Sequence, residues 1–169
     1  MKIFIMRHGE AANISGEDSR RPLTAKGILE TEKAGHWLAG CKSLLMNVFV
    51  SPYLRTQQTC SNVTAVLAKT ELLDDITPQT LDFITPAGDA RHLHNFIDGL
   101  LQSDNESSTA HNINDNQSLL FISHMPLVSY LVSELTGSLS MPIFSTGEIA
   151  VIDYDIKRMQ GRLVEMVIP

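Results

Sequence analysis

The chain has 169 residues, of which 43% are hydrophobic and 19% charged, and its formal net charge is −6. Length and composition indicate one folded domain rather than a disordered or fibrous chain, and the acidic balance argues against nucleic acid or an anionic membrane as partner. No apolar run approaches the ~20 residues of a membrane span, and the apolar start after Lys2 is too short for a signal peptide. Two cysteines, Cys41 and Cys60, make no disulfide framework, so we expect reduced thiols in a cytoplasmic protein.

The first half of the chain alternates short apolar runs with helical patterns. Residues 2–6 and 46–50 are expected to form buried strands. Thr24 is a candidate N-cap for a helix that ends near Gly40, where glycine favours a stop. After the second strand, Ser51 is the expected N-cap of another helix, with Pro52 at its first position.

The second half continues this alternation and then changes character. Asp89 is expected to cap a helix with apolar residues at helical spacing, and a strong strand at 119–123 is followed by a helix that begins at Pro126. The polar segment 102–118 is expected to be a surface loop. Two apolar runs, 149–154 and 163–168, flank a turn-rich stretch and predict a hairpin.

Together these elements predict a three-layer α/β fold in a single domain over 1–169. It has a central, mostly parallel sheet flanked by helices and a C-terminal hairpin. Arg7-His8-Gly9 follows the first strand, the segment from Ser51 to Arg55 follows the second, and His124 follows the third. Carboxyl ends of parallel strands share one edge, where α/β proteins build their sites. Arginine side chains and helix N-termini at that edge suit a tetrahedral oxyanion such as phosphate.

These residues carry a resemblance that covers most of the chain. The sequence resembles the histidine phosphatase (phosphoglycerate mutase-like) superfamily, and within it the short SixA-type phosphohistidine phosphatases. The matching stretches are FIMRHGEA at 4–11, RPLTAKG at 21–27, SPYLRTQQT at 51–59, TPAGD at 85–89 and SHMPLV at 123–128. Few insertions separate them, which favours the SixA type over the longer mutases.

The resemblance assigns roles to these positions. His8 is implied to be the nucleophile that forms a phosphohistidine intermediate, with Arg7, Arg55 and His124 around the phosphoryl group. Arg21 is a weaker candidate for the mouth of the pocket. Two guanidinium groups and a protonated His124 would neutralise the equatorial oxygens without a metal or cofactor. His92 and His94 are not expected to bind a metal, because their spacing places them on different faces of a helix.

One departure from the superfamily pattern concerns the general acid. Many members carry a glutamate in a Leu-x-Glu-x-x-x-Gly stretch, and Phe83 stands at that place here. Asp82 and Glu10 are the remaining candidates for this role. An alkoxide leaves poorly without a proton, whereas an imidazole, with a conjugate acid near pKa ~6.5, can leave already protonated. A pocket without a dedicated acid therefore favours a phosphorus–nitrogen bond.

We therefore expect a metal-independent phosphohistidine phosphatase. By the resemblance, its substrates would be histidine-phosphorylated phosphotransfer domains or related phosphocarrier proteins. Two alternatives stay open: a small-molecule phosphatase or phosphoramidate hydrolase with the same pocket, and a non-catalytic module that binds phosphate or a phosphoprotein. Contacts with a protein partner are expected from segments 12–20 and 102–118.

Overall fold

The computed structural model describes residues 1–41, 43–70, 77–106 and 117–169. In chain order the elements are β1 (Lys2–Arg7), the short 3-10 helix η1 (Asp18–Arg20), α1 (Ala25–Gly40), β2 (Leu44–Val50), α2 (Leu54–Leu67), β3 (Gln79–Thr80), α3 (Ala90–Glu106), β4 (Gln117–Ser123), α4 (Leu127–Thr136), β5 (Ile149–Asp155) and β6 (Gln160–Val167).

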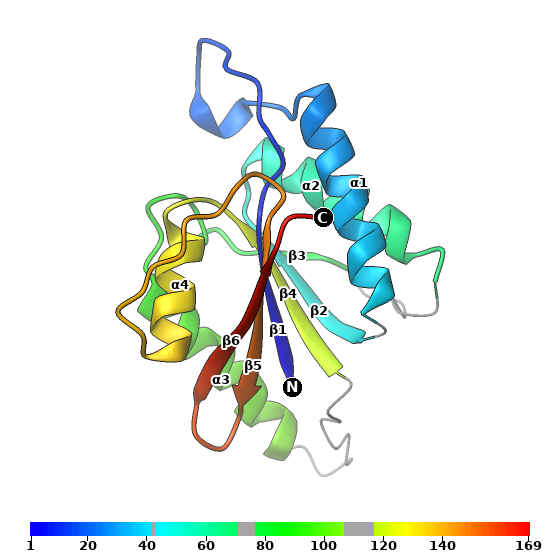
Figure 1. Ribbon diagram of the computed structural model, residues 1–169. Coiled ribbons are helices and arrows are strands. Elements are labelled where there is room, and N and C mark those ends of the chain that lie inside the picture. The colour runs from blue at the N-terminus through cyan, green and yellow to red at the C-terminus, as the bar shows by residue number, and fades with distance from the viewer. Residues whose placement is uncertain (42, 71–76, 107–116) are drawn as a thin grey trace.

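The strands form one six-stranded sheet in the order β3-β2-β4-β1-β5-β6. Neighbouring strands from β3 to β1 pair in parallel, whereas β5 pairs antiparallel with β1 and β6 antiparallel with β5. The predicted parallel sheet and C-terminal hairpin are therefore confirmed. The carboxyl ends of β1, β2 and β4 meet at one edge, the upper edge in Figure 1.

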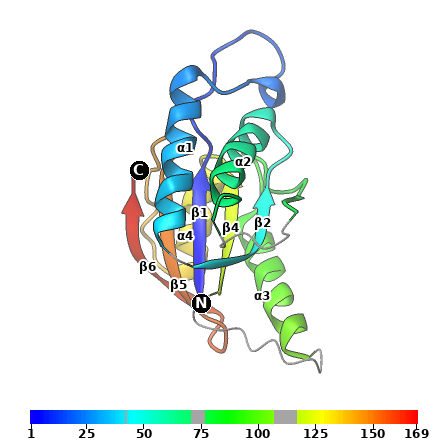
Figure 2. The same ribbon diagram turned by 90° about the vertical axis from the view of Figure 1, so that its right-hand side faces the viewer.

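Helices cover both faces of the sheet, with α3 and α4 on one side and α1 and α2 on the other (Figures 1 and 2). Alternate residues of β1 supply the two cores: Ile3 and Ile5 pack with the α3 and α4 side chains, whereas Phe4 and Met6 pack with those of α1 and α2. Successive side chains of a strand point to opposite faces, so a strand buried on both faces needs an unbroken apolar run. The apolar run at the start of the sequence therefore predicted the first strand.

Two predicted helix caps are confirmed and one is wrong. Thr24 accepts a hydrogen bond from the Gly27 amide at the start of α1, and Asp89 accepts from the Arg91 amide at the start of α3. Ser51, however, is not an N-cap, because α2 begins at Leu54 with Tyr53 as its cap residue. Ser-Pro satisfies the local preferences of a helix start, but here the serine hydroxyl bonds to a distant histidine instead.

The predicted loop over 102–118 is too long at both ends. Helix α3 continues to Glu106 and β4 begins at Gln117, while 107–116 lies outside the described residues. Cys41 and Cys60 form no disulfide. Among the helices of the described residues, none is long and apolar enough to cross a membrane.

Candidate active site

A hollow of about 390 Å³ lies at the carboxyl edge of the sheet. Its walls come from the ends of β1 and β4, the start of α2, and the loops around η1, Pro86 and Thr146. All five phosphate-site residues expected from the sequence line it, although they come from four separate segments. The lining residues are Arg7, His8, Glu10, Ala11, Asp18, Arg21, Arg55, Pro86, His124, Met125 and Thr146.

The ring of His8 is held so that its two nitrogens have different roles. Its Nδ1 lies 2.7 Å from the Gly9 carbonyl oxygen, which can only accept, so Nδ1 carries the proton and donates. The lone pair therefore resides on Nε2, which accepts from Arg55 Nε at 3.2 Å. Burial first, and then the charges of the Arg55 and Arg7 guanidinium groups, lower the pKa of His8 to about 4, against the raising effect of the Gly9 hydrogen bond. A neutral imidazole with its nucleophilic nitrogen inside the pocket is the result.

Arg55 is fixed by a carboxylate as well as by His8. Its Nη1 donates to the Asp18 carbonyl oxygen at 2.6 Å and its Nη2 to the Asp18 carboxylate at 2.9 Å. The guanidinium also lies 4.9 Å from the centre of the Tyr53 ring. The Arg55 side chain is only 5% exposed, so a cation is held rigidly beside the nucleophile.

Two further arginines contribute positive charge. Arg7 donates from Nη1 to the Phe144 carbonyl oxygen at 2.6 Å, and its buried Nε has no hydrogen-bond partner among the described residues. Arg21 donates from Nε to the Ala12 carbonyl oxygen and from Nη1 to the Asp18 carboxylate at 3.0 Å. The unsatisfied Arg7 N–H is a donor that an oxyanion in the pocket can satisfy.

His124 faces His8, with ring centres 5.1 Å apart. Its Nε2 is 2.7 Å from the Ser51 hydroxyl, and its buried Nδ1 has no hydrogen-bond partner among the described residues. Burial and the neighbouring His8 lower the pKa of His124 to about 2. The environment thus favours a neutral His124, not the protonated one expected from the sequence. When the Ser51 hydroxyl donates to Nε2, Nδ1–H becomes a second donor for an oxyanion.

The two helices α1 and α2 support the backbone of the loop that carries His8. The Gly9 amide donates to the Thr59 hydroxyl of α2 at 3.1 Å. On the other side, a side chain at Gly9 would place its Cβ 2.5 Å from the Gly27 carbonyl oxygen of α1. Glu30 of α1 accepts from the Glu10 amide at 2.8 Å and from the Thr146 hydroxyl at 3.0 Å, which joins two pocket loops.

The two candidate acids differ in their relation to the hollow. Asp82 is exposed in the turn after β3 and does not line the hollow. Glu10 does line it, but its carboxylate accepts from Lys26 Nζ at 2.8 Å and from the Thr24 hydroxyl at 2.9 Å. These bonds, the Lys26 bond first, lower the pKa of Glu10. Glu10 is therefore an anion near neutral pH.

Several residues at the site were not found by sequence reasoning. Asp18 holds Arg55, whereas Thr59 and Glu30 hold the loop that carries His8. Each of the three was missed because its partner is 20 or more residues away in the sequence. Ser51 was noticed, but for the wrong role. One sequence signal pointed towards three of these residues. Asp18 lies in segment 12–20, and Ser51 and Thr59 lie in the stretch 51–59, whereas Glu30 lies in neither.

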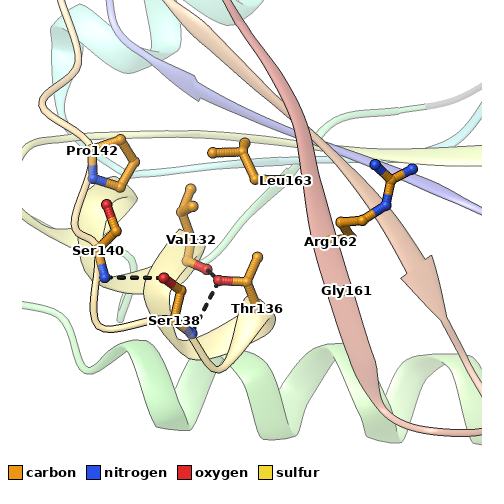
Figure 3. Close-up of a pocket in the computed structure, with 8 residues that line it drawn as sticks. All are labelled: Val132, Thr136, Ser138, Ser140, Pro142, Gly161, Arg162 and Leu163. Carbon is orange, nitrogen blue, oxygen red and sulfur yellow. Dashed lines mark hydrogen bonds between the residues drawn. The ribbon is translucent and has the colours of Figure 1, made fainter.

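A second hollow, of about 270 Å³, lies between α4 and β6 (Figure 3). It is near Thr136, at the end of α4 opposite to His124, and Val132, Pro142 and Leu163 give it an apolar wall. Ser138 accepts from the Ser140 amide and its own amide donates to the Thr136 hydroxyl, as Figure 3 shows. None of the expected site residues lines this hollow.

The two histidines of α3, His92 and His94, have structural partners. His92 packs edge-on against Phe83, and His94 lies 2.8 Å from the Tyr154 hydroxyl. Within the described part of the chain, no group of three or more His, Cys, Asp or Glu side chains is arranged to hold a metal ion.

Comparisons with known proteins place the chain in a family. Residues 3–77 match the model of the histidine phosphatase superfamily (branch 1). The chain is 37% identical over 155 residues to phosphohistidine phosphatase SixA of Escherichia coli (strain K12), a match that covers 92% of this chain and 86% of that protein. It is 34% identical over 160 residues to a SixA homolog of Haemophilus influenzae, covering 92% and 89% of the two chains.

Solved structures give the same result. The protein histidine phosphatase SixA complexed with tungstate superposes with a TM-score of 0.83 at 36% identity, over 100% of this chain and 97% of that one. The match in sequence and fold extends over nearly the whole chain, including the segments that carry His8, Arg55 and His124. The chain belongs to the histidine phosphatase superfamily and, within it, to the SixA family.

Proposed function

We propose that the protein is a phosphohistidine phosphatase that works through a covalent phospho-His8 intermediate. The observation that carries this proposal is the fixed tautomer of His8, whose neutral Nε2 lies beside the Arg55 guanidinium. A pure binding module has no need of a nucleophilic nitrogen at the centre of its anion site. The relatives in Escherichia coli and Haemophilus influenzae are named as phosphohistidine phosphatases, which supports the same substrate class here.

The first half of the reaction transfers the phosphoryl group to the enzyme. His8 Nε2 attacks phosphorus in line, a new P–N bond forms, and the P–N bond to the substrate imidazole breaks, leaving its electron pair on that ring. Phosphoryl transfer depends mainly on positioning and on neutralising the equatorial oxygens. Arg7, Arg55 and, in the tautomer that carries Nδ1–H, His124 would provide this from the walls of the pocket, with Arg21 at the mouth.

The second half returns the enzyme to its starting state. A water oxygen attacks phosphorus, the P–Nε2 bond breaks, and inorganic phosphate leaves with the protons of the water. The hydrogen bond from Nδ1 to the Gly9 carbonyl keeps the ring in place through both steps. We infer that the substrate is a histidine-phosphorylated phosphotransfer domain or phosphocarrier protein. Hydrogen bonds hold Glu10 and Asp18, the carboxylates in the lining of the pocket, as anions, and an imidazole can leave without a proton donor, whereas an alkoxide leaves poorly.

The test is release of phosphate from a histidine-phosphorylated phosphotransfer domain, measured beside 4-nitrophenyl phosphate. We expect the wild type to turn over the phosphoprotein with the higher kcat/KM and His8→Ala to lose at least about 10³-fold, as removal of a nucleophile does. The matched control is His36→Ala, since His36 is exposed on α1, outside the pocket. Cleavage of small phosphoramidates or esters alone would indicate a small-molecule phosphatase, and no turnover of any of them would favour a binding module.

A further inference from the structure

Asp18 introduces a negative charge into the anion pocket. Its carboxylate bridges two arginines, with Oδ2 at 2.9 Å from Arg55 Nη2 and Oδ1 at 3.0 Å from Arg21 Nη1. The Asp18 side chain is 52% exposed, whereas that of Arg55 is 5% exposed. The carboxylate therefore lies on the open side of the guanidinium, above the buried nucleophile.

This carboxylate is an anion with room for another donor. The hydrogen bonds from Arg55 and Arg21 lower the pKa of Asp18, so the group does not supply a proton near neutral pH. An ionised carboxylate has about four lone-pair sites. Two of them are used by the arginine bonds, and each oxygen therefore keeps the capacity to accept from a ligand.

The position of Asp18 determines which part of a substrate it meets. In an in-line transfer the leaving group stands opposite the nucleophile, so it enters from the open side of the pocket. Arg55 bonds to both groups, donating from Nε to His8 Nε2 and from Nη2 to the Asp18 carboxylate. A leaving group bound beyond the phosphoryl group is therefore flanked by an anion.

Imidazole and ester leaving groups respond to that anion in opposite ways. A phosphorylated imidazole has a second ring nitrogen, and protonation there makes the ring a cation that leaves as neutral imidazole. An ester oxygen carries no N–H and becomes negative as its bond to phosphorus breaks. A carboxylate stabilises the first leaving group and repels the second.

We propose that Asp18 is a specificity-determining residue whose carboxylate accepts a hydrogen bond from the distal ring N–H of the leaving imidazole and so favours phosphohistidine over phosphate esters. This inference rests on the proposed function. In the transfer, the Nε2–P bond forms as the P–N bond of the substrate breaks. The electron pair returns to the leaving ring, and the proton on the distal nitrogen stays there.

The experiment measures kcat/KM for a histidine-phosphorylated phosphotransfer domain and for 4-nitrophenyl phosphate in the wild type, Asp18→Asn and Asp18→Glu. We expect Asp18→Asn to lower turnover of the phosphoprotein about 10- to 100-fold more than turnover of the ester, the range for a hydrogen bond to a charged group. Asp18→Glu restores part of the ratio. The control is Glu17→Gln, which removes a charge from the same loop, where Glu17 pairs with Arg20 and not with the pocket arginines; it should leave the ratio unchanged.

A pH profile gives a second readout. Asp18 holds the proton on the leaving imidazole, so the basic limb of kcat/KM for the phosphoprotein should lie at higher pH in the wild type than in Asp18→Asn. An equal loss on both substrates, which leaves the ratio unchanged, would mean that Asp18 only positions Arg55 and would overturn the inference; so would wild-type activity on both substrates in Asp18→Asn. A wild type that does not act on the phosphoprotein would instead overturn the proposed function itself.

Discussion

At the level of single residues, the positive charge of the site and its neutral nitrogen lone pairs come from different side chains. Arginines supply the positive charge, and burial keeps both imidazoles neutral. A protonated His8 would have no lone pair for phosphorus, so the low pKa preserves its nucleophilicity well below neutral pH. The hydrogen bond to the Gly9 carbonyl oxygen leaves the lone pair of His8 on Nε2.

The low pKa of His8 has a consequence for stability that can be measured. His8 has a pKa of about 4 when folded and ~6.5 when unfolded, so between these values the unfolded chain binds more protons. The contribution of His8 to the free energy of unfolding is therefore fully present above pH ~6.5 and is lost as the pH falls towards 4. We expect His8→Asn to remove a loss on the order of 2 kcal/mol between pH 7 and pH 5, as measured by urea unfolding.

The exposed His36 provides the control for that measurement. His36→Asn should keep the wild-type dependence of the unfolding free energy on pH, because His36 is exposed on α1 and lies outside the pocket. Identical slopes for His8→Asn and the wild type would mean that His8 is not buried as a neutral ring.

At the level of elements, α1 and α2 position the loop that carries His8. From α2, the Thr59 hydroxyl accepts from the Gly9 amide and donates to the Arg55 carbonyl of its own helix. The Gly9 amide donates to the Thr59 hydroxyl in a buried setting, so removal of that hydroxyl leaves the amide without a hydrogen-bond partner.

We expect Thr59→Val to lower the free energy of unfolding by about 1–3 kcal/mol and to reduce kcat together with it. Thr64→Val is the matched control, since the Thr64 hydroxyl donates within α2 to the Cys60 and Ser61 carbonyls and not to the loop that carries His8. Urea unfolding and phosphoprotein turnover are measured on both variants. Equal effects of the two substitutions would show that the bond to Gly9 does not hold the loop.

The contrast between Thr24 and Ser51 shows what the sequence can predict about these elements. Thr24 caps α1 through a bond to an amide three residues away, so the local pattern was sufficient. Ser51 carries an equally good cap signal, but its partner His124 is 73 residues away and is reached only once β2 and β4 pair. The strands and the edge that unites His8, Arg55 and His124 followed from apolar runs, whereas the contacts of Asp18 and Thr59 depend on tertiary packing.

At the level of the whole molecule, the two hollows lie at opposite ends of α4 and differ in chemistry. The one at the carboxyl edge combines three arginines with two neutral histidines, whereas the one between α4 and β6 is largely apolar, with Arg162 at its wall. The net charge of −6 does not attract anions to the protein as a whole. Binding of an oxyanion therefore depends on local arginines, of which the carboxyl-edge hollow has three in its lining and the hollow between α4 and β6 has one.

This difference predicts how an oxyanion changes thermal stability. Tungstate at about 100 times its Kd should stabilise the wild type by about 2.7 kcal/mol, a rise in Tm of about 5–10 °C for a chain of this size. Arg7→Met should lose most of that rise relative to its own Tm without tungstate, since it removes the buried N–H left for the anion. Arg162→Met removes an arginine that is 76% exposed at the other hollow and should keep the full rise. If Arg162→Met abolished the shift and Arg7→Met kept it, the oxyanion would bind between α4 and β6, and the carboxyl-edge pocket would not be the phosphate site.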